Sequence, residues 1–137
     1  MATHQHPELY FHVGLGRTGT TFLQEAVFPK FKDIYYINKK GYKRIDEIIE
    51  STNAEKYLHS HEFSKKLIEE MRRFSQKYPD TKIILVLRRH DKWMASHYKR
   101  NIKNGMPANF DAYLDLDSDQ GFWKQEDVFY MPKIKCI

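Results

Sequence analysis

The chain has 137 residues, of which 41% are hydrophobic, and this suits one domain, spanning residues 1–137, with a single core. No apolar run approaches the length of a membrane-spanning helix, and the single cysteine, Cys136, excludes an internal disulfide framework. The formal net charge of +5 suits a protein that binds a polyanion, and charge alone does not separate a small anionic ligand from nucleic acid.

In chain order, residues 1–7 come first, and they lack the basic and apolar regions of a signal peptide, so we expect a cytoplasmic protein. Beyond them, short apolar runs alternate with helical patterns, which is typical of an α/β domain. We therefore expect a three-layer, P-loop-like fold in which helices flank a mainly parallel central sheet. The expected strands cover residues 9–14, 34–38, 57–61 and 82–88, and the expected helices cover residues 19–28, 44–51, 64–78, 91–104 and 109–116.

The first expected strand ends in a glycine turn that opens into a hydroxyl-rich helix start. Gly14 and Gly19 permit backbone conformations that a side chain would forbid, so several backbone N–H groups can converge on a phosphate or sulfate. Further donors and a fixed positive charge come from Arg17, Thr18, Thr20 and Thr21. We expect Phe22 and Leu23, which follow, to pack the first helix on the sheet.

Several interpretations of this loop compete. Residues 14–21 fit the P-loop pattern G-x-x-x-x-G-K-[ST], except that Thr20 stands where the lysine belongs. The glycines also fit the dinucleotide pattern G-x-G-x-x-G, which requires an acidic residue about 20 positions further on. The second expected strand ends at Asn38 and two lysines instead. A plain connecting turn between strand and helix is the remaining alternative.

A second candidate site follows the apolar strand at residues 82–87. A nucleoside triphosphatase normally places a magnesium-holding aspartate near the end of such a strand, whereas this strand ends in Arg88 and Arg89. Asp91 can cap the next helix, which places Ser96 on its second turn. Arg88 and Ser96 can then face one anion above the sheet, and a forked guanidinium with a hydroxyl suits a terminal phosphate.

Together, the two sites resemble those of the sulfotransferases that use 3′-phosphoadenosine 5′-phosphosulfate (PAPS). In that family a basic residue followed by T-G-T-T holds the 5′ end of the donor, and Arg17–Thr21 is similar to that motif. A strand-end arginine and a serine eight residues later bind the 3′-phosphate in the family, and Arg88 and Ser96 match both type and spacing. The resemblance covers roughly residues 9–28 and 57–105. It implies that the reaction releases 3′,5′-adenosine bisphosphate (PAP) and requires no metal.

The resemblance also implies roles for individual residues. Arg17 stands where the family usually has lysine, and we assign it the contact with the leaving group and the sulfuryl group. The expected donor-binding residues are Arg17, Thr18, Gly19, Thr20, Thr21, Arg88 and Ser96.

The catalytic base is expected from the third strand. That segment is similar to one in which cytosolic family members carry a histidine and carbohydrate-directed members can carry a glutamate. Alternation places His59 and His61 on one face of the strand, and Ser60 and Glu62 on the other. We favour Glu62, which comes last and nearest the cleft, with His61 second. The alternatives are polar residues of a strand edge or a His-x-His metal pair.

Two departures from the family pattern affect these expectations. Gly16 replaces a proline that often precedes the basic residue, and residues 121–137 contain no basic, glycine-containing segment that would close over the 3′-phosphate and adenine. We therefore expect a short or truncated member, or one whose site is completed by a homo-oligomer or a partner chain. The expected acceptor is a small molecule or a carbohydrate, with no role for nucleic acid or membranes. A noncatalytic PAPS-binding or PAP-binding relative and a P-loop phosphotransferase are the alternative functions.

Overall fold

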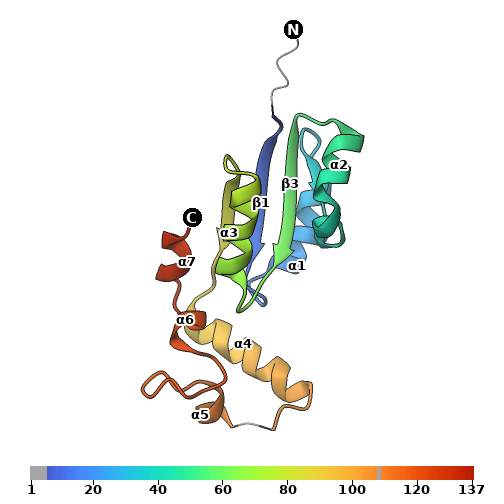
Figure 1. The fold of residues 1–137 in the computed structure, drawn as a ribbon. Helices are drawn as coiled ribbons and strands as arrows, with labels where there is room; N and C mark the ends of the chain where they lie inside the picture. The colour runs from blue at the N-terminus through green and yellow to red at the C-terminus, as the bar shows by residue number, and fades with distance from the viewer. Residues whose placement is uncertain (1–5, 108) are drawn as a thin grey trace.

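The computed structural model describes residues 6–107 and 109–137 and confirms the α/β fold (Figure 1). Four parallel strands form one sheet in the order β2-β3-β1-β4, and helices flank it. The strands are β1 (Glu8–Gly14), β2 (Tyr35–Ile37), β3 (Lys56–Glu62) and β4 (Lys82–Val86). The expectation that residues 1–7 hold no signal peptide falls mainly on residues 1–5, which lie outside the described part.

The order of the strands determines which helices share a face of the sheet. The chain runs from β1 through α1 (Thr20–Phe22) to β2, then through α2 (Ile45–Thr52) to β3, and through α3 (Leu67–Lys77) to β4. Right-handed crossovers between parallel strands place α2 and α3 on one face and α1 on the other. The side chains of β1 support this arrangement. Phe11 packs on Phe74 of α3, with 4.4 Å between ring centroids, whereas His12 packs on Phe28, beyond α1, at 5.0 Å.

The hydrophobic core lies between the sheet and the helices α2 and α3, which cover one of its faces. Alternate residues of β1 and its extension, Phe11, Val13 and Leu15, are fully buried, as expected for a strand between two layers. The buried residues of α3 have helical spacing and form one apolar stripe, which consists of Leu67, Met71 and Phe74.

The expectation of one regular helix over residues 19–28 is wrong. The α-helical part, α1, is three residues long and continues as a π-helical turn, Leu23–Val27, and a 3-10 helix, Phe28–Lys30. Pro29 has no N–H to continue an α-helical ladder, and its ring crowds the carbonyl four residues earlier, which accounts for the irregular winding before it. A further 3-10 helix, Lys39–Arg44, precedes α2.

Beyond β4 the described residues form four more helices, α4 (His90–Lys103), α5 (Phe110–Tyr113), α6 (Gln125–Val128) and α7 (Met131–Lys135). The helix expected over residues 109–116 is thus shorter, and the sequence did not predict the last two. Asp91 does not cap α4 as expected, because both its carboxylate oxygens accept hydrogen bonds from Arg89.

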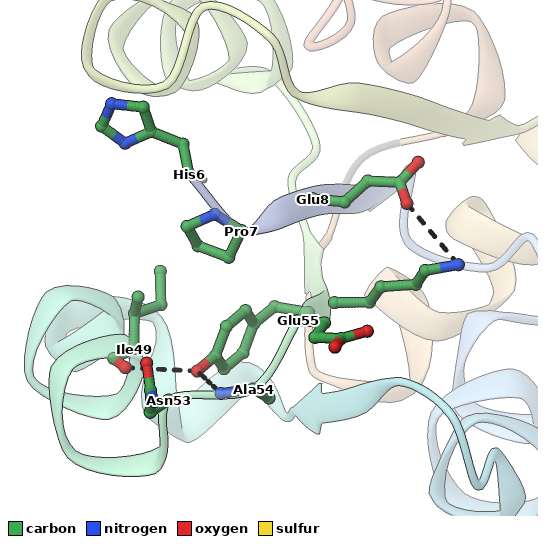
Figure 2. A pocket seen from close by; sticks show the side chains of 9 residues that line it. His6, Pro7, Glu8, Ile49, Asn53, Ala54 and Glu55 are labelled. Carbon is green, nitrogen blue, oxygen red and sulfur yellow. Dashed lines mark hydrogen bonds and ion pairs between the residues drawn. The ribbon is translucent and has the colours of Figure 1, made fainter. Parts of the chain in front are cut away.

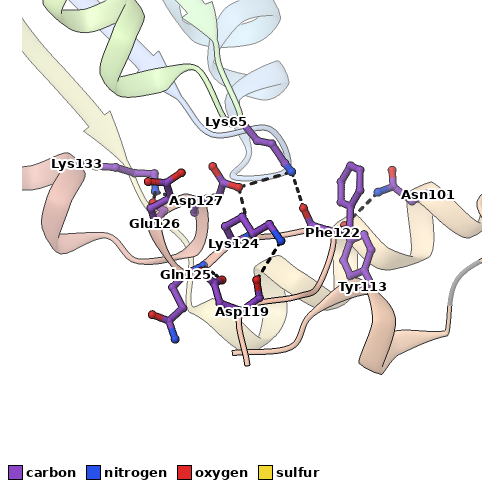
Figure 3. Close-up of polar contacts among 10 residues, drawn as sticks. All are labelled: Lys65, Asn101, Tyr113, Asp119, Phe122, Lys124, Gln125, Glu126, Asp127 and Lys133. Atoms are coloured by element: carbon purple, nitrogen blue, oxygen red, sulfur yellow. Dashed lines mark hydrogen bonds and ion pairs between the residues drawn. The ribbon is translucent and has the colours of Figure 1, made fainter. Parts of the chain in front are cut away.

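Polar contacts stabilise the C-terminal segment, residues 110–137, and hold it against the rest of the chain (Figure 3). Lys133 is 2% exposed, and its Nζ donates to the carbonyls of Asp127 at 2.7 Å and Phe129 at 2.9 Å, which α6 itself leaves unpaired. Burial lowers the pKa of Lys133. Lys65, just before α3, donates to the carbonyl of Phe122 at 2.5 Å. No helix in the described residues has both the length and the apolar composition needed to cross a membrane.

Candidate functional site

The carboxyl ends of three strands meet at the loop that follows β1. Gly14 pairs in register with Glu62 of β3 on one side and with Val86 of β4 on the other. The chain leaves β1 toward α1 on one face of the sheet and leaves β3 toward α3 on the opposite face. When the segments that follow two neighbouring strands turn to opposite faces of the sheet, a crevice forms at the carboxyl ends of those strands. Open α/β sheets bind their ligands in such crevices.

The loop after β1 presents backbone N–H groups that have no internal partners. Arg17 has a φ of 69° and Gly19 a φ of 86°, so both lie in the left-handed region. This conformation is uncommon for a residue with a side chain, and such outliers cluster at functional sites. Gly16 and Arg17 form a hydrogen-bonded turn, and in the described part of the chain the N–H groups of Arg17, Gly19 and Thr20 donate to no other group. Free N–H groups in a turn of this kind form a concave site for an anion.

Helix α4 holds the loop in place. The Trp93 Nε1 and the His97 Nε2 each donate to the carbonyl of Gly16 at 2.9 Å. Burial lowers the pKa of His97, and the nearby charges of Arg17 and Arg100 lower it further. The loop is therefore fixed by buried aromatic donors.

Three of the residues expected at the donor site, Arg17, Arg88 and Ser96, come together in the structure. The Nε of Arg17 donates to the Oγ of Ser96 at 2.9 Å, and the Nη1 of Arg88 donates to the carbonyl of Arg17 at 3.1 Å. Neither guanidinium has a carboxylate partner within residues 6–107 and 109–137. Two uncompensated positive charges at the same edge of the sheet favour an anionic ligand.

The threonines of the loop divide into inward-facing and outward-facing side chains. The hydroxyl of Thr18 donates to the carbonyl of Leu15 at 2.7 Å, and Thr20, which is 1% exposed, donates to the carboxylate of Glu62. Thr21 is exposed. The hydroxyl hydrogens of Thr18 and Thr20 therefore stabilise the loop, and Thr21 is the hydroxyl open to a ligand.

Of the two candidate bases, the structure brings Glu62 to the loop. Glu62 and Arg17 line one pocket of about 390 Å³, whose walls also come from α4 and from the C-terminal segment. His61 does not line it, because its ring stacks on Phe63 at 4.4 Å and its Nδ1 donates to the carbonyl of Glu62 at 2.9 Å. His59, on the same face as His61, is buried.

A larger pocket, of about 570 Å³, lies at the opposite end of the strands (Figure 2). It surrounds Pro7, and the Tyr57 hydroxyl on its wall already accepts from the N–H of Ala54 at 2.6 Å and donates to the carbonyl of Ile49 at 3.2 Å. Because it lies at the amino ends of parallel strands, away from the loop, we do not assign it to the candidate site.

One aromatic side chain beside the loop lies where the sequence pattern did not predict it. Phe22, expected to pack on the sheet, is 67% exposed. An exposed ring directly after Thr21 offers a stacking surface for a planar group next to the anion cradle. Its place after the loop was visible in the sequence, but its exposure was not.

Position 14 requires glycine because the side chain of Thr20 lies close to it, and not because the backbone there has a positive φ. A Cβ at this position would lie 2.2 Å from Cγ2 of the buried Thr20, whereas a Cβ at Gly16 would lie no closer than 3.6 Å to any neighbour. We expect Gly14→Ala to destabilise the protein by about 1–3 kcal/mol, because overpacking displaces Thr20 and its bond to Glu62. Chemical denaturation tests this, with Gly16→Ala as the matched control. Equal stability of the two variants would contradict it.

The comparisons with known proteins add no family assignment. The chain matches no model of a known protein family, and it has no significantly similar sequence among curated proteins.

Proposed function

We propose that this protein transfers a sulfuryl group from PAPS to a hydroxyl or amine acceptor. The observation that carries the proposal is the convergence of Arg17, Arg88 and Ser96 beside a loop of free N–H groups, with no carboxylate paired to either guanidinium in the described residues. A nucleotide with anionic groups at both its 5′ and 3′ positions matches such a site, because each end requires its own cluster of donors.

The residues present fit the two ends of this donor. The loop Arg17–Thr21 would hold the 5′-phosphosulfate, and Arg88 with Ser96 would hold the 3′-phosphate. The exposed ring of Phe22 would stack on the purine. When bound, the donor supplies a sulfuryl group on a phosphate leaving group, and the proposal requires no metal.

Two side chains of this chain would act on the reacting atoms. Glu62 would take the proton of the acceptor as its oxygen or nitrogen bonds to sulfur, and PAP would leave with the electron pair of the broken sulfur–oxygen bond. Arg17 would stabilise the negative charge that develops on the leaving phosphate. Thr20 donates to one carboxylate oxygen of Glu62, which orients the carboxylate toward the pocket.

Two alternatives predict different binding. A noncatalytic relative would bind PAP and PAPS equally without transfer. A P-loop phosphotransferase would bind ATP with magnesium, but its lysine position is taken by Thr20, whose side chain is buried and bonded to Glu62. The structure therefore favours the phosphotransferase least.

Calorimetric titration of the protein with PAP, without magnesium, tests the proposal. We expect micromolar binding of PAP and roughly tenfold to hundredfold weaker binding of 5′-AMP, since 5′-AMP lacks the phosphate that would pair with Arg88. Equal affinity for the two nucleotides, or no binding, would overturn the donor assignment. Incubation with PAPS and an acceptor then separates an enzyme from a noncatalytic binder.

A further inference from the structure

The pocket that contains Glu62 has a second group of cations that the donor site does not use. Lys65 and Arg100 line it together with Arg17, and Glu62 is the single carboxylate among its lining residues. Its volume of about 390 Å³ lies within the range of about 300–1,000 Å³ that is usual for small-molecule sites. Arg88 and Ser96, which the proposal assigns to the 3′-phosphate, do not line it.

Helix α4 places Arg100 where its side chain can contact a ligand in the pocket. It follows Ser96 by one turn of α4, so both side chains lie on the same face of that helix. Ser96 bonds to Arg17, which places Arg100 beside the loop. Arg100 is exposed and has no ion-pair partner in the part of the chain that the structure describes. Its charge is therefore available to the contents of the pocket.

Lys65 is held on the wall of the pocket by the C-terminal segment (Figure 3). Its Nζ donates to the carbonyl of Phe122 at 2.5 Å and lies 4.1 Å from the centre of the Phe122 ring. Asp127 approaches the same Nζ at 3.6 Å, so it neutralises part of this charge but does not line the pocket. Lys65 therefore adds a partly neutralised charge to the pocket, and Arg100 and Arg17 add positive charges that no carboxylate pairs in the described residues.

We infer that this pocket binds the acceptor, and that the acceptor carries an anionic group, a carboxylate or a sulfate, beside the hydroxyl to be modified. The inference rests on the proposed function. Arg100 and Lys65 would pair with the anionic group, while Glu62, on the loop side of the pocket, would face the hydroxyl. Ser64 and Asn101 add polar groups on the same wall that suit further hydroxyls.

Two pairs of probes that differ in a single charge test the inference by nuclear magnetic resonance titration, with and without saturating PAP. Methyl glucuronide and methyl glucoside represent a sugar acceptor, and 4-hydroxybenzoate and 4-hydroxybenzamide represent a phenolic one. We expect the anionic member of at least one pair to bind roughly tenfold more tightly than its neutral partner. The pair that shows the preference identifies the type of acceptor.

Substitutions on α4 show whether Arg100 causes the preference. We expect Arg100→Gln to abolish it and Lys103→Gln, which removes an exposed charge from the same helix outside the pocket, to keep it. Equal affinity within both pairs would overturn the inference, as would an Arg100→Gln variant that loses PAP affinity instead. Failure of PAP to bind would contradict the donor assignment separately, since the charge preference is also measured without PAP.

Discussion

Replacement of Arg88 by alanine is expected to weaken PAP binding by about 1.5–3 kcal/mol, roughly tenfold to hundredfold in Kd. The reason is that Arg88 combines a phosphate-binding fork with an unpaired charge at the carboxyl edge of the sheet. In the described residues, the guanidinium of Arg88 donates one hydrogen bond, to the carbonyl of Arg17. Calorimetric titration of the variant with PAP measures the loss.

The neighbouring arginine provides a matched control for this experiment. Arg89 has the same side chain one position later, but its guanidinium forms two bonds of 2.6 Å to Asp91. Arg89→Ala should leave the Kd for PAP within about twofold, because its charge is already paired. Arg88→Lys should bind with intermediate affinity, since it keeps the charge and loses the fork. Unchanged affinity in Arg88→Ala would remove Arg88 from the site.

The fold was largely predictable because β1 and β4 coincide with short, largely apolar runs that have clear ends. The expected strand over residues 9–14 differs by one residue from β1, and the expected strand over residues 82–88 begins with β4 and outlasts it by two residues. The positions of Arg17 and Arg88 at neighbouring strand ends followed from the same pattern, because parallel strands end at one edge of a sheet.

The orientation of the first helical segment was not predictable, because the sheet beneath it is polar. Thr20 bonds to Glu62, and Gln24 donates to Ser60 at 2.9 Å, so polar residues face the sheet and Phe22 faces outward. A prediction from apolar periodicity assumes that the buried face of a helix is hydrophobic. That assumption fails here, since the face of β1 and β3 under this segment carries His12, Ser60 and Glu62.

The pocket beyond Glu62 was not predictable for a different reason. Its walls combine Lys65 with Phe122, which are 57 residues apart, through a side-chain contact to a backbone carbonyl. The C-terminal segment that supplies Phe122 has short helices without a long apolar stripe. Tertiary contacts of this kind leave no periodic signal in the sequence.

Two buried histidines are expected to make the protein unstable in mild acid. Burial lowers the pKa of His12 to about 4 and that of His59 to about 3, from an ordinary value near 6.5. Nδ1 of His59 donates to the carbonyl of Ile37 at 3.1 Å, and its Nε2 is buried without a partner in the described residues. Protonation would therefore bury both a charge and an unpaired N–H group.

The sign of the effect follows from these pKa values. The unfolded chain binds protons at both histidines below about pH 6.5, and the folded protein does not until pH 4 to 3, so stability falls as the pH falls through this range. Each histidine is expected to contribute a loss of about 3–5 kcal/mol once the pH reaches its folded pKa. Denaturant titrations between pH 7.5 and 4.5 measure the slope. The pKa values of Glu8 and Asp91 are lowered to about 2, so these carboxylates lose most of their contribution to the free energy of unfolding below that pH window.

A substitution that removes one titrating ring separates this explanation from general acid sensitivity. The ring of His59 packs against those of Phe11, at 5.0 Å, and Tyr42, at 5.1 Å, so phenylalanine can replace it at similar volume. Between pH 6 and 4.5 we expect His59→Phe to reduce the dependence of the unfolding free energy on pH by about 1.4 kcal/mol per pH unit, the contribution of one proton. His6→Asn, at an exposed position, should leave the slope unchanged. An unchanged slope in His59→Phe would show that the buried ring at position 59 does not set the acid limit of the fold.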